Sequence, residues 1–62
     1  MVTNINIGDI ITLRHEIVRG AGVVGIFRGV QGINTATGNV YYGVSLVGRE
    51  WEINAIDAED IV

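Results

Sequence analysis

The stretch that most constrains the fold is residues 20–29, Gly-Ala-Gly-Val-Val-Gly-Ile-Phe-Arg-Gly, which contains the pattern GxGxxG. In a dinucleotide-binding fold this pattern opens a helix that directly follows a strand. Here a further glycine and several β-branched residues follow, and each glycine would destabilise a helix by about 1 kcal/mol relative to alanine. The sequence therefore predicts that Gly20 and Gly22 shape a turn or bulge and that residues 23–30 continue as a central strand.

The size of the chain sets a limit on how much apolar surface it can bury. Its 62 residues predict one domain, 1–62, and a domain of this size buries only about 60% of the surface of its unfolded chain. With 48% hydrophobic residues, apolar surface is expected to remain outside the core. The sequence therefore predicts a face that contacts another copy or a protein partner.

Charge and cysteine usage exclude several classes of protein. There is no cysteine, which rules out disulfides, thiolate metal sites and thiol nucleophiles. The net charge of −3 argues against a protein that holds nucleic acid or anionic lipid by its overall field. No apolar run approaches the ~20 residues that span a bilayer, and residues 1–8 do not have the pattern of a signal peptide. We expect no membrane association and a cytoplasmic location.

Alternation of apolar and polar residues predicts short strands along the chain. Ile11 and Leu13 share one face of the first barrel strand, and an excursion loop follows it and closes at Gly20. Turn-forming residues predict a hairpin loop before the next strand, with Gly38 near its tip. The expected elements are a lead-in strand at 3–7, strands at 10–14, 23–30, 40–47, 50–55 and 61–62, loops at 15–19 and 31–39, a tight turn at 48–49, and one helical turn at 57–60 capped by Asp57.

Three strands carry predictions about which side chains share a face. In the strand 40–47, Val40, Tyr42, Val44 and Leu46 face one way, and Tyr41, Gly43, Ser45 and Val47 face the other. In the strand 50–55, the inward set is Trp51, Ile53 and Ala55, between outward Glu50, Glu52 and Asn54. In the central strand, the inward set is Val24, Ile26 and Val30, which turns Val23 and Phe27 outward unless a bulge at Gly25 reverses the register.

This order of elements resembles the SH3-like barrel of small bacterial proteins and subunits. The resemblance implies an all-β, five-stranded SH3-like barrel with a single helical turn before the last strand. Similar layouts occur in the small SH3-like subunit of photosystem I, the β-subunit of nitrile hydratase, KOW modules and type II dihydrofolate reductases, so the resemblance implies a fold and not a function. The segments that carry it are Gly8-Asp9-Ile10-Ile11, the glycine cluster with Val23-Val24, Tyr42-Gly43-Val44, Trp51-Glu52-Ile53 and Ala58-Glu59-Asp60-Ile61.

The enzymatic member of that group is similar to this chain at only one site position. Type II dihydrofolate reductases bind folate and NADPH in a tetrameric pore through a Val-Gln-Ile-Tyr segment, where this chain has Trp51-Glu52-Ile53-Asn54, and only Ile53 matches. Glu52 would place carboxylates around a pore for anionic ligands, and no Lys is present to match the lysine of that pore. A pore-type reductase therefore stays the second alternative.

Other residues of catalytic type have simpler interpretations. His15 and Glu16 would point to opposite faces of a strand, and Ser45 has no partner that would make it a nucleophile. Asp57, Glu59 and Asp60 lack the spacing of a calcium loop and suit a helix cap. We predict no catalytic residues, no metal and no cofactor.

The sequence favours a small non-enzymatic protein-interaction or assembly module that self-associates. Its expected interface residues are Val23, Phe27 and Tyr41. The first alternative is a nucleic-acid-binding module of the SH3-like or KOW type, in which arginines contact the backbone and an aromatic ring stacks on a base. Its residues would be Arg14, Arg28, Arg49 and Tyr41.

Overall fold

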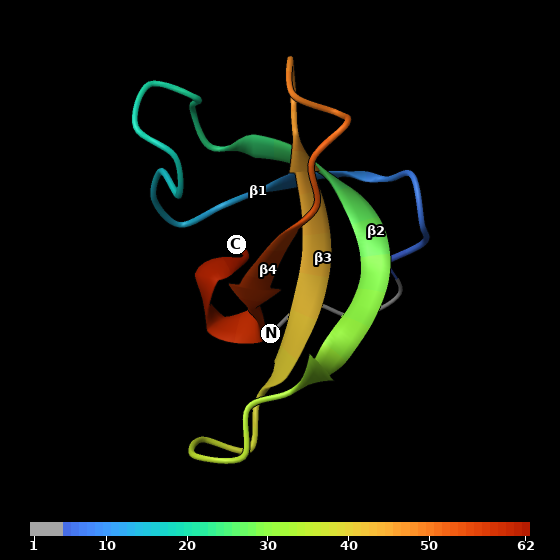
Figure 1. Ribbon diagram of the computed structural model, residues 1–62, viewed down its shortest axis with the longest axis vertical. Coiled ribbons are helices and arrows are strands. Elements are labelled where there is room, and N and C mark those ends of the chain that lie inside the picture. The colour runs from blue at the N-terminus through green and yellow to red at the C-terminus, as the bar shows by residue number, and fades with distance from the viewer. Residues whose placement is uncertain (1–4) are drawn as a thin grey trace.

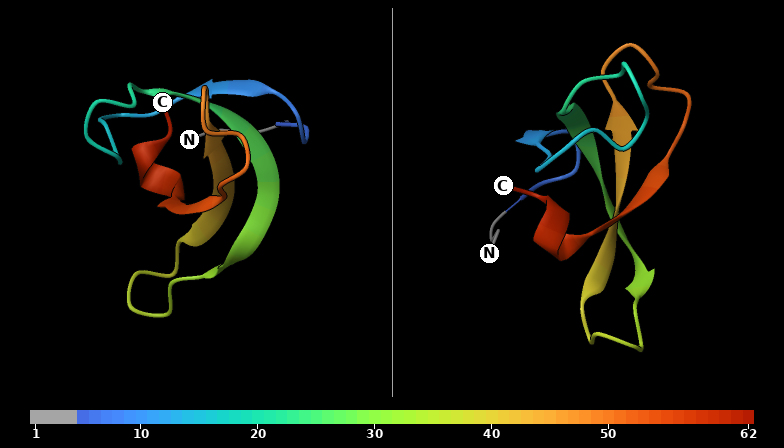
Figure 2. Two further views of the ribbon diagram at one scale, coloured as in Figure 1. Left: turned by 45° about the horizontal axis from the view of Figure 1, so that its top comes forward. Right: turned by 90° about the vertical axis from the view of Figure 1, so that its left-hand side faces the viewer.

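The computed structural model describes residues 5–62 and is all-β (Figure 1). Four antiparallel strands form one sheet in the order β1-β2-β3-β4, and a single 3₁₀ turn follows the last strand. The elements are β1 (Ile10–Thr12), β2 (Val24–Ile33), β3 (Val40–Leu46), β4 (Asn54–Asp57) and η1 (Ala58–Asp60). The sheet is strongly curved, and β2 bends around η1 and the C-terminal residues (Figure 2).

The predicted strands 10–14, 23–30 and 40–47 are confirmed with shifted ends. β1 ends at Thr12, β2 runs on to Ile33, and the hairpin loop therefore covers only residues 34–39. Gly38 has φ +78° at the tip of this loop, as expected for a residue that must adopt the left-handed region. Of the expected lead-in strand, Thr3 and Asn4 lie outside the described residues, and residues 5–7 form no strand.

The expected fifth strand, 61–62, is replaced by an isolated bridge. Ile61 pairs with Leu13, the Arg14 N–H donates to the Asp60 carbonyl at 2.7 Å, and the Val62 N–H donates to the Thr12 carbonyl at 2.9 Å. Residues 60–62 therefore lie antiparallel beside residues 12–14. The helical turn before them is confirmed, because the Asp57 carboxylate accepts the Glu59 N–H at 2.9 Å as an N-cap.

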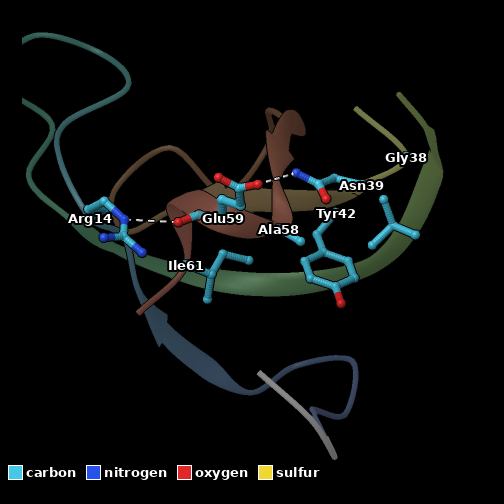
Figure 3. Close-up of a pocket in the computed structure, with 8 residues that line it drawn as sticks. Arg14, Gly38, Asn39, Tyr42, Ala58, Glu59 and Ile61 are labelled. Carbon is cyan, nitrogen blue, oxygen red and sulfur yellow. Dashed lines mark hydrogen bonds between the residues drawn. The ribbon is translucent and has the colours of Figure 1, made fainter. Parts of the chain in front are cut away.

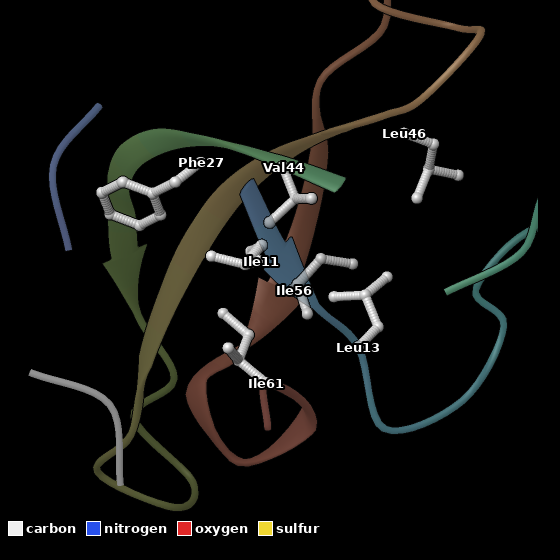
Figure 4. Close-up of a cluster of buried hydrophobic side chains, with 7 residues drawn as sticks. All are labelled: Ile11, Leu13, Phe27, Val44, Leu46, Ile56 and Ile61. Carbon is white, nitrogen blue, oxygen red and sulfur yellow. The ribbon is translucent and has the colours of Figure 1, made fainter. Parts of the chain in front are cut away.

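The core lies on the concave side of the sheet, between the strands and the C-terminal residues (Figure 4). The shared faces predicted for Ile11 with Leu13 and for Val44 with Leu46 are confirmed, and both pairs face the core. Ile5, Val18, Ala21, Val23 and Tyr42 are half-buried against this cluster. The buried apolar residues are Ile11, Leu13, Phe27, Val44, Leu46, Ile56 and Ile61.

The outward position predicted for Phe27 is wrong. Its side chain is only 6% exposed, and its ring packs edge to face with that of Tyr42 at a centroid distance of 5.2 Å. Gly25 lies on the same inward face, because a Cβ there would stand 2.5 Å from Val44 Cγ1. Val44 thus fills the space left by the glycine. Of the residues that we expected inside, Val24 and Val30 are exposed, and Ile26 is half-buried on the face opposite Phe27. The pairing of β2 with β3 has two register shifts, between Phe27 and Val30 and between Val30 and Gly32, and none at Gly25.

The inward positions predicted for Trp51, Ile53 and Ala55 are also wrong. All three are exposed, and Ile56 is the buried residue of β4. The cause is that residues 47–52 fold into turns. In these turns the Arg49 N–H donates to the Leu46 carbonyl, and the Glu52 N–H donates to the Arg49 carbonyl. The strand therefore starts only at Asn54, with the opposite set of side chains facing the core.

Candidate interaction surface

The convex face of the sheet carries exposed apolar side chains. Ile10 pairs with Ile26, and Val24 lies further along the same face of β2. Ile53 covers the next part of this face, because a Cβ at Gly43 would stand 3.0 Å from Ile53 Cγ2. Ile10 is 65% exposed and Ile53 is 59% exposed. We name Ile10, Val24, Ile26 and Ile53 the outer apolar patch.

A polar contact between Arg28 and Ser45 crosses the middle of the outer apolar patch. Ser45 is fully buried, accepts a hydrogen bond from Arg28 Nε at 3.0 Å and donates to the Glu52 carbonyl at 2.7 Å. Arg28 also donates through Nη2 to the Glu50 carbonyl at 3.4 Å. These hydrogen bonds fasten the loop 47–53 onto the convex face. Ser45 is therefore a structural residue, and its burial under this loop explains why a serine lies in the middle of β3.

The loop 47–53 is further held by its own side chains. Arg49 donates to both carboxylate oxygens of Glu52, at 3.1 and 2.9 Å, and the Glu50 carboxylate accepts the Gly48 N–H at 2.8 Å. The bond from Gly48 lowers the pKa of Glu50, and the Arg49 side chain lowers the pKa of Glu52. Both carboxylates are therefore ionised at neutral pH. Trp51 lies between them and is 75% exposed.

Removing the Ser45 hydroxyl is expected to loosen this loop. Ser45→Ala leaves Arg28 Nε and the Glu52 carbonyl without their partner, which should lower the free energy of unfolding by about 1 kcal/mol. Urea denaturation measures this loss, and amide hydrogen exchange at residues 50–53 should accelerate. Thr35→Ala, an exposed change in the hairpin loop, is the control and should alter neither quantity. Unchanged exchange in Ser45→Ala would show that the hydroxyl does not hold the loop.

A groove of about 470 Å³ lies on the other side of the molecule, between the hairpin end of β3 and the C-terminal turn (Figure 3). Arg14 stands at one end, where its Nε donates to the Glu59 carbonyl at 2.9 Å. Asn39 stands at the other end, where its amide donates to the Asp57 carboxylate at 3.2 Å and the Glu59 carboxylate at 2.6 Å. The groove is lined by Arg14, Gly38, Asn39, Val40, Tyr42, Ala58, Glu59 and Ile61.

The expected interface residues do not form one surface. Phe27 belongs to the core, and Val23 is half-buried against it. Tyr41 is half-buried and pairs with Gly32 and Asp57, at the opposite end of the sheet from Val23.

The arginines of the nucleic-acid alternative are separated as well. Arg28 and Arg49 both hold the loop 47–53, and Arg49 forms an ion pair with Glu52 at 2.9 Å. Arg14 lies apart from them in the groove. Reasoning from the sequence missed both the groove and the exposed Trp51, although the charged neighbours of Trp51 were a signal of an exposed loop.

The GxGxxG stretch has a structural role in which Glu16 takes part. Gly20 and Gly22 have φ of +81° and +80° and form the turn predicted for them. The Glu16 carboxylate accepts the N–H groups of Gly22 at 3.0 Å and Gly20 at 3.5 Å. A phosphate in this turn would have to compete with Glu16 for those two N–H groups. His15, next to Glu16, is exposed.

With this geometry in place, known proteins were compared with the chain. No family model, curated protein or solved structure matches it. Within residues 5–62, no three His, Cys, Asp or Glu side chains are grouped so that they could hold a metal ion. In the same part of the chain, no helix has the length and apolar character needed to cross a membrane. Any functional assignment must therefore come from the surface itself.

Proposed function

We propose that this protein is a non-enzymatic assembly module of the SH3-like barrel type, which associates with further copies of itself. The pairing of residues 60–62 with residues 12–14 supports the barrel, because it brings the end of the chain against the free edge of β1. A closed sheet removes edges that would otherwise pair with other chains without specificity. Association is then left to side chains on the outside of the sheet.

The observation that carries the proposal is the exposed Trp51 on a fastened loop beside the outer apolar patch. Tryptophan is among the residues that contribute most to protein interfaces, since it offers a large apolar area and has few side-chain torsions to immobilise. The loop is already held by Arg28, Ser45 and the Arg49–Glu52 pair, so little conformational freedom is lost on binding. Exposed apolar groups of this size are typical of a contact site.

A test is the molar mass of the purified protein by light scattering across a concentration series. We expect the mass to rise above that of the 6.7 kDa monomer as concentration increases. Ile10→Asp places a charge in the outer apolar patch and should shift this rise to higher concentration, with little effect on the fold because the side chain is exposed.

A matched control is available in the same sheet. Ile33 is exposed to the same extent as Ile10, 65%, but lies at the far end of β2 outside the outer apolar patch. Ile33→Asp should self-associate as the wild type does. A wild type that stays monomeric up to millimolar concentration would refute self-association, and equal effects of the two variants would refute the assigned face.

A further inference from the structure

The groove has the properties of a receptor for an aromatic side chain. Its volume of about 470 Å³ falls within the range of about 300–1,000 Å³ that is usual for binding pockets. The ring of Tyr42 and the side chains of Val40 and Ile61 give it an apolar lining. Aromatic rings pack favourably against one another in offset or edge-to-face arrangements. The apolar lining therefore suits a flat ring.

Arg14 adds a cation at the end of this lining. Only its Nε is engaged, by the Glu59 carbonyl, which orients the guanidinium and leaves the terminal nitrogens available. Among the described residues, no carboxylate lies within ion-pair distance of Arg14. A guanidinium over a ring face interacts best with tryptophan, and its free nitrogens would also attract a carboxylate. The groove is thus suited to tryptophan with an acidic neighbour.

The chain itself supplies such a group in the loop 47–53. Trp51 is the single tryptophan of the chain, is 75% exposed and is preceded by the carboxylate of Glu50. The low pKa of Glu50 keeps this carboxylate charged. The loop follows the end of β3, whereas the groove lies at the beginning of β3 beside the hairpin, so the two sites occupy opposite ends of the molecule (Figure 1). Trp51 cannot reach the groove of its own chain.

We propose that the groove between Arg14, Tyr42 and Ile61 receives Trp51 of a second copy, with Glu50 of that copy against Arg14. This proposal rests on the self-association proposed above and names its contact. The two contacting surfaces are different, so the association is head to tail, and each added copy presents a new groove and a new Trp51. Assembly then continues into a filament, or into a ring where the rotation between copies closes.

Two single variants and their mixture test this contact. Trp51→Ala removes the inserted group and keeps the groove, whereas Ala58→Phe fills the groove and keeps Trp51. We expect each variant alone to self-associate at least about thirty-fold more weakly than the wild type, the effect of losing a dominant interface residue. Mixed together, they should form a 1:1 dimer and nothing larger, because only one complementary pair of surfaces remains.

Controls separate this result from a folding defect. Ala36→Phe adds the same ring in the hairpin loop, outside the groove, and should self-associate as the wild type does. Each variant must have the circular dichroism spectrum of the wild type. Arg14→Gln serves as a second groove variant that adds no volume.

Other outcomes distinguish this proposal from the proposed function. A wild type that self-associates while both Ala58→Phe and Arg14→Gln behave like it would overturn the groove contact and leave self-association standing. Growth of the mixture beyond a dimer would overturn the head-to-tail arrangement. A monomeric wild type would overturn both proposals, and the groove would then be open to a different occupant.

Discussion

Phe27→Ala should leave most of the protein unfolded at room temperature. Phe27 belongs to the buried cluster, pairs with Val44 across the sheet and packs edge to face with Tyr42. Replacing a buried phenylalanine with alanine typically costs about 3 to 5 kcal/mol. A chain of 62 residues has a total stability of only about 3 to 9 kcal/mol at the usual value per residue. The expected loss is therefore comparable to the total free energy of unfolding of the protein.

Circular dichroism and the dispersion of amide resonances measure this effect, and Trp51→Ala is the matched aromatic control. Trp51 is largely exposed, so its removal should change the free energy of unfolding by less than about 0.5 kcal/mol. The order of these two effects is the reverse of the one expected from the alternation pattern alone. A folded Phe27→Ala together with an unfolded Trp51→Ala would show that both strands have the opposite orientation.

Gly25→Val has the second largest expected effect, a loss of about 1 to 3 kcal/mol or more. A Cβ at position 25 would stand 2.5 Å from Val44 Cγ1 and 3.3 Å from the Ser45 carbonyl oxygen. Added volume in a packed core forces side chains and backbone out of their preferred positions. The rigid neighbour is part of β3, so the strain cannot be relieved by a flexible side chain at the surface.

The matched control is Gly32→Val in the same strand. No atom lies within 4 Å of a Cβ at position 32, and the backbone there is outside the left-handed region, so this change should be close to neutral. Thermal or urea denaturation compares the two variants. The double variant Gly25→Ala with Val44→Ala should be less destabilised than the sum of its single variants, because the smaller residue 44 makes room for the new methyl group. Strict additivity would mean that Gly25 does not stand against Val44.

Sequence patterns predicted the elements whose inward and outward sides differ chemically. Ile11 and Leu13 alternate with Thr12 and Arg14, which placed the two apolar residues on one face. Local rules gave the Asp57 cap and the Gly38 turn, since both depend on neighbouring residues only. In residues 23–30, however, both faces are apolar, and alternation has no information on which of them is buried. The decision depends on Val44, whose side chain occupies the space over Gly25.

The prediction for the strand 50–55 is wrong for a different reason. Its alternation is regular, but Ser45 captures the Glu52 carbonyl, and turns occupy the residues before Asn54. Because of this contact between two residues seven positions apart, the strand starts later than predicted, and the opposite set of its side chains faces the core. Sequence patterns could not predict the candidate sites, because each site is formed by segments that lie apart in the sequence. The groove needs residue 14, the hairpin end and η1 together, and no period in the sequence relates these.

The pairing of Leu13 with Ile61 also affects how this protein is made. Leu13 is only 2% exposed, and the residue that it pairs with lies far along the chain. During synthesis, Leu13 lacks this neighbour until Ile61 has left the ribosome. The fold is therefore completed only after Ile61 has emerged. Until then the nascent chain exposes apolar core side chains, the condition in which partly folded chains aggregate most readily.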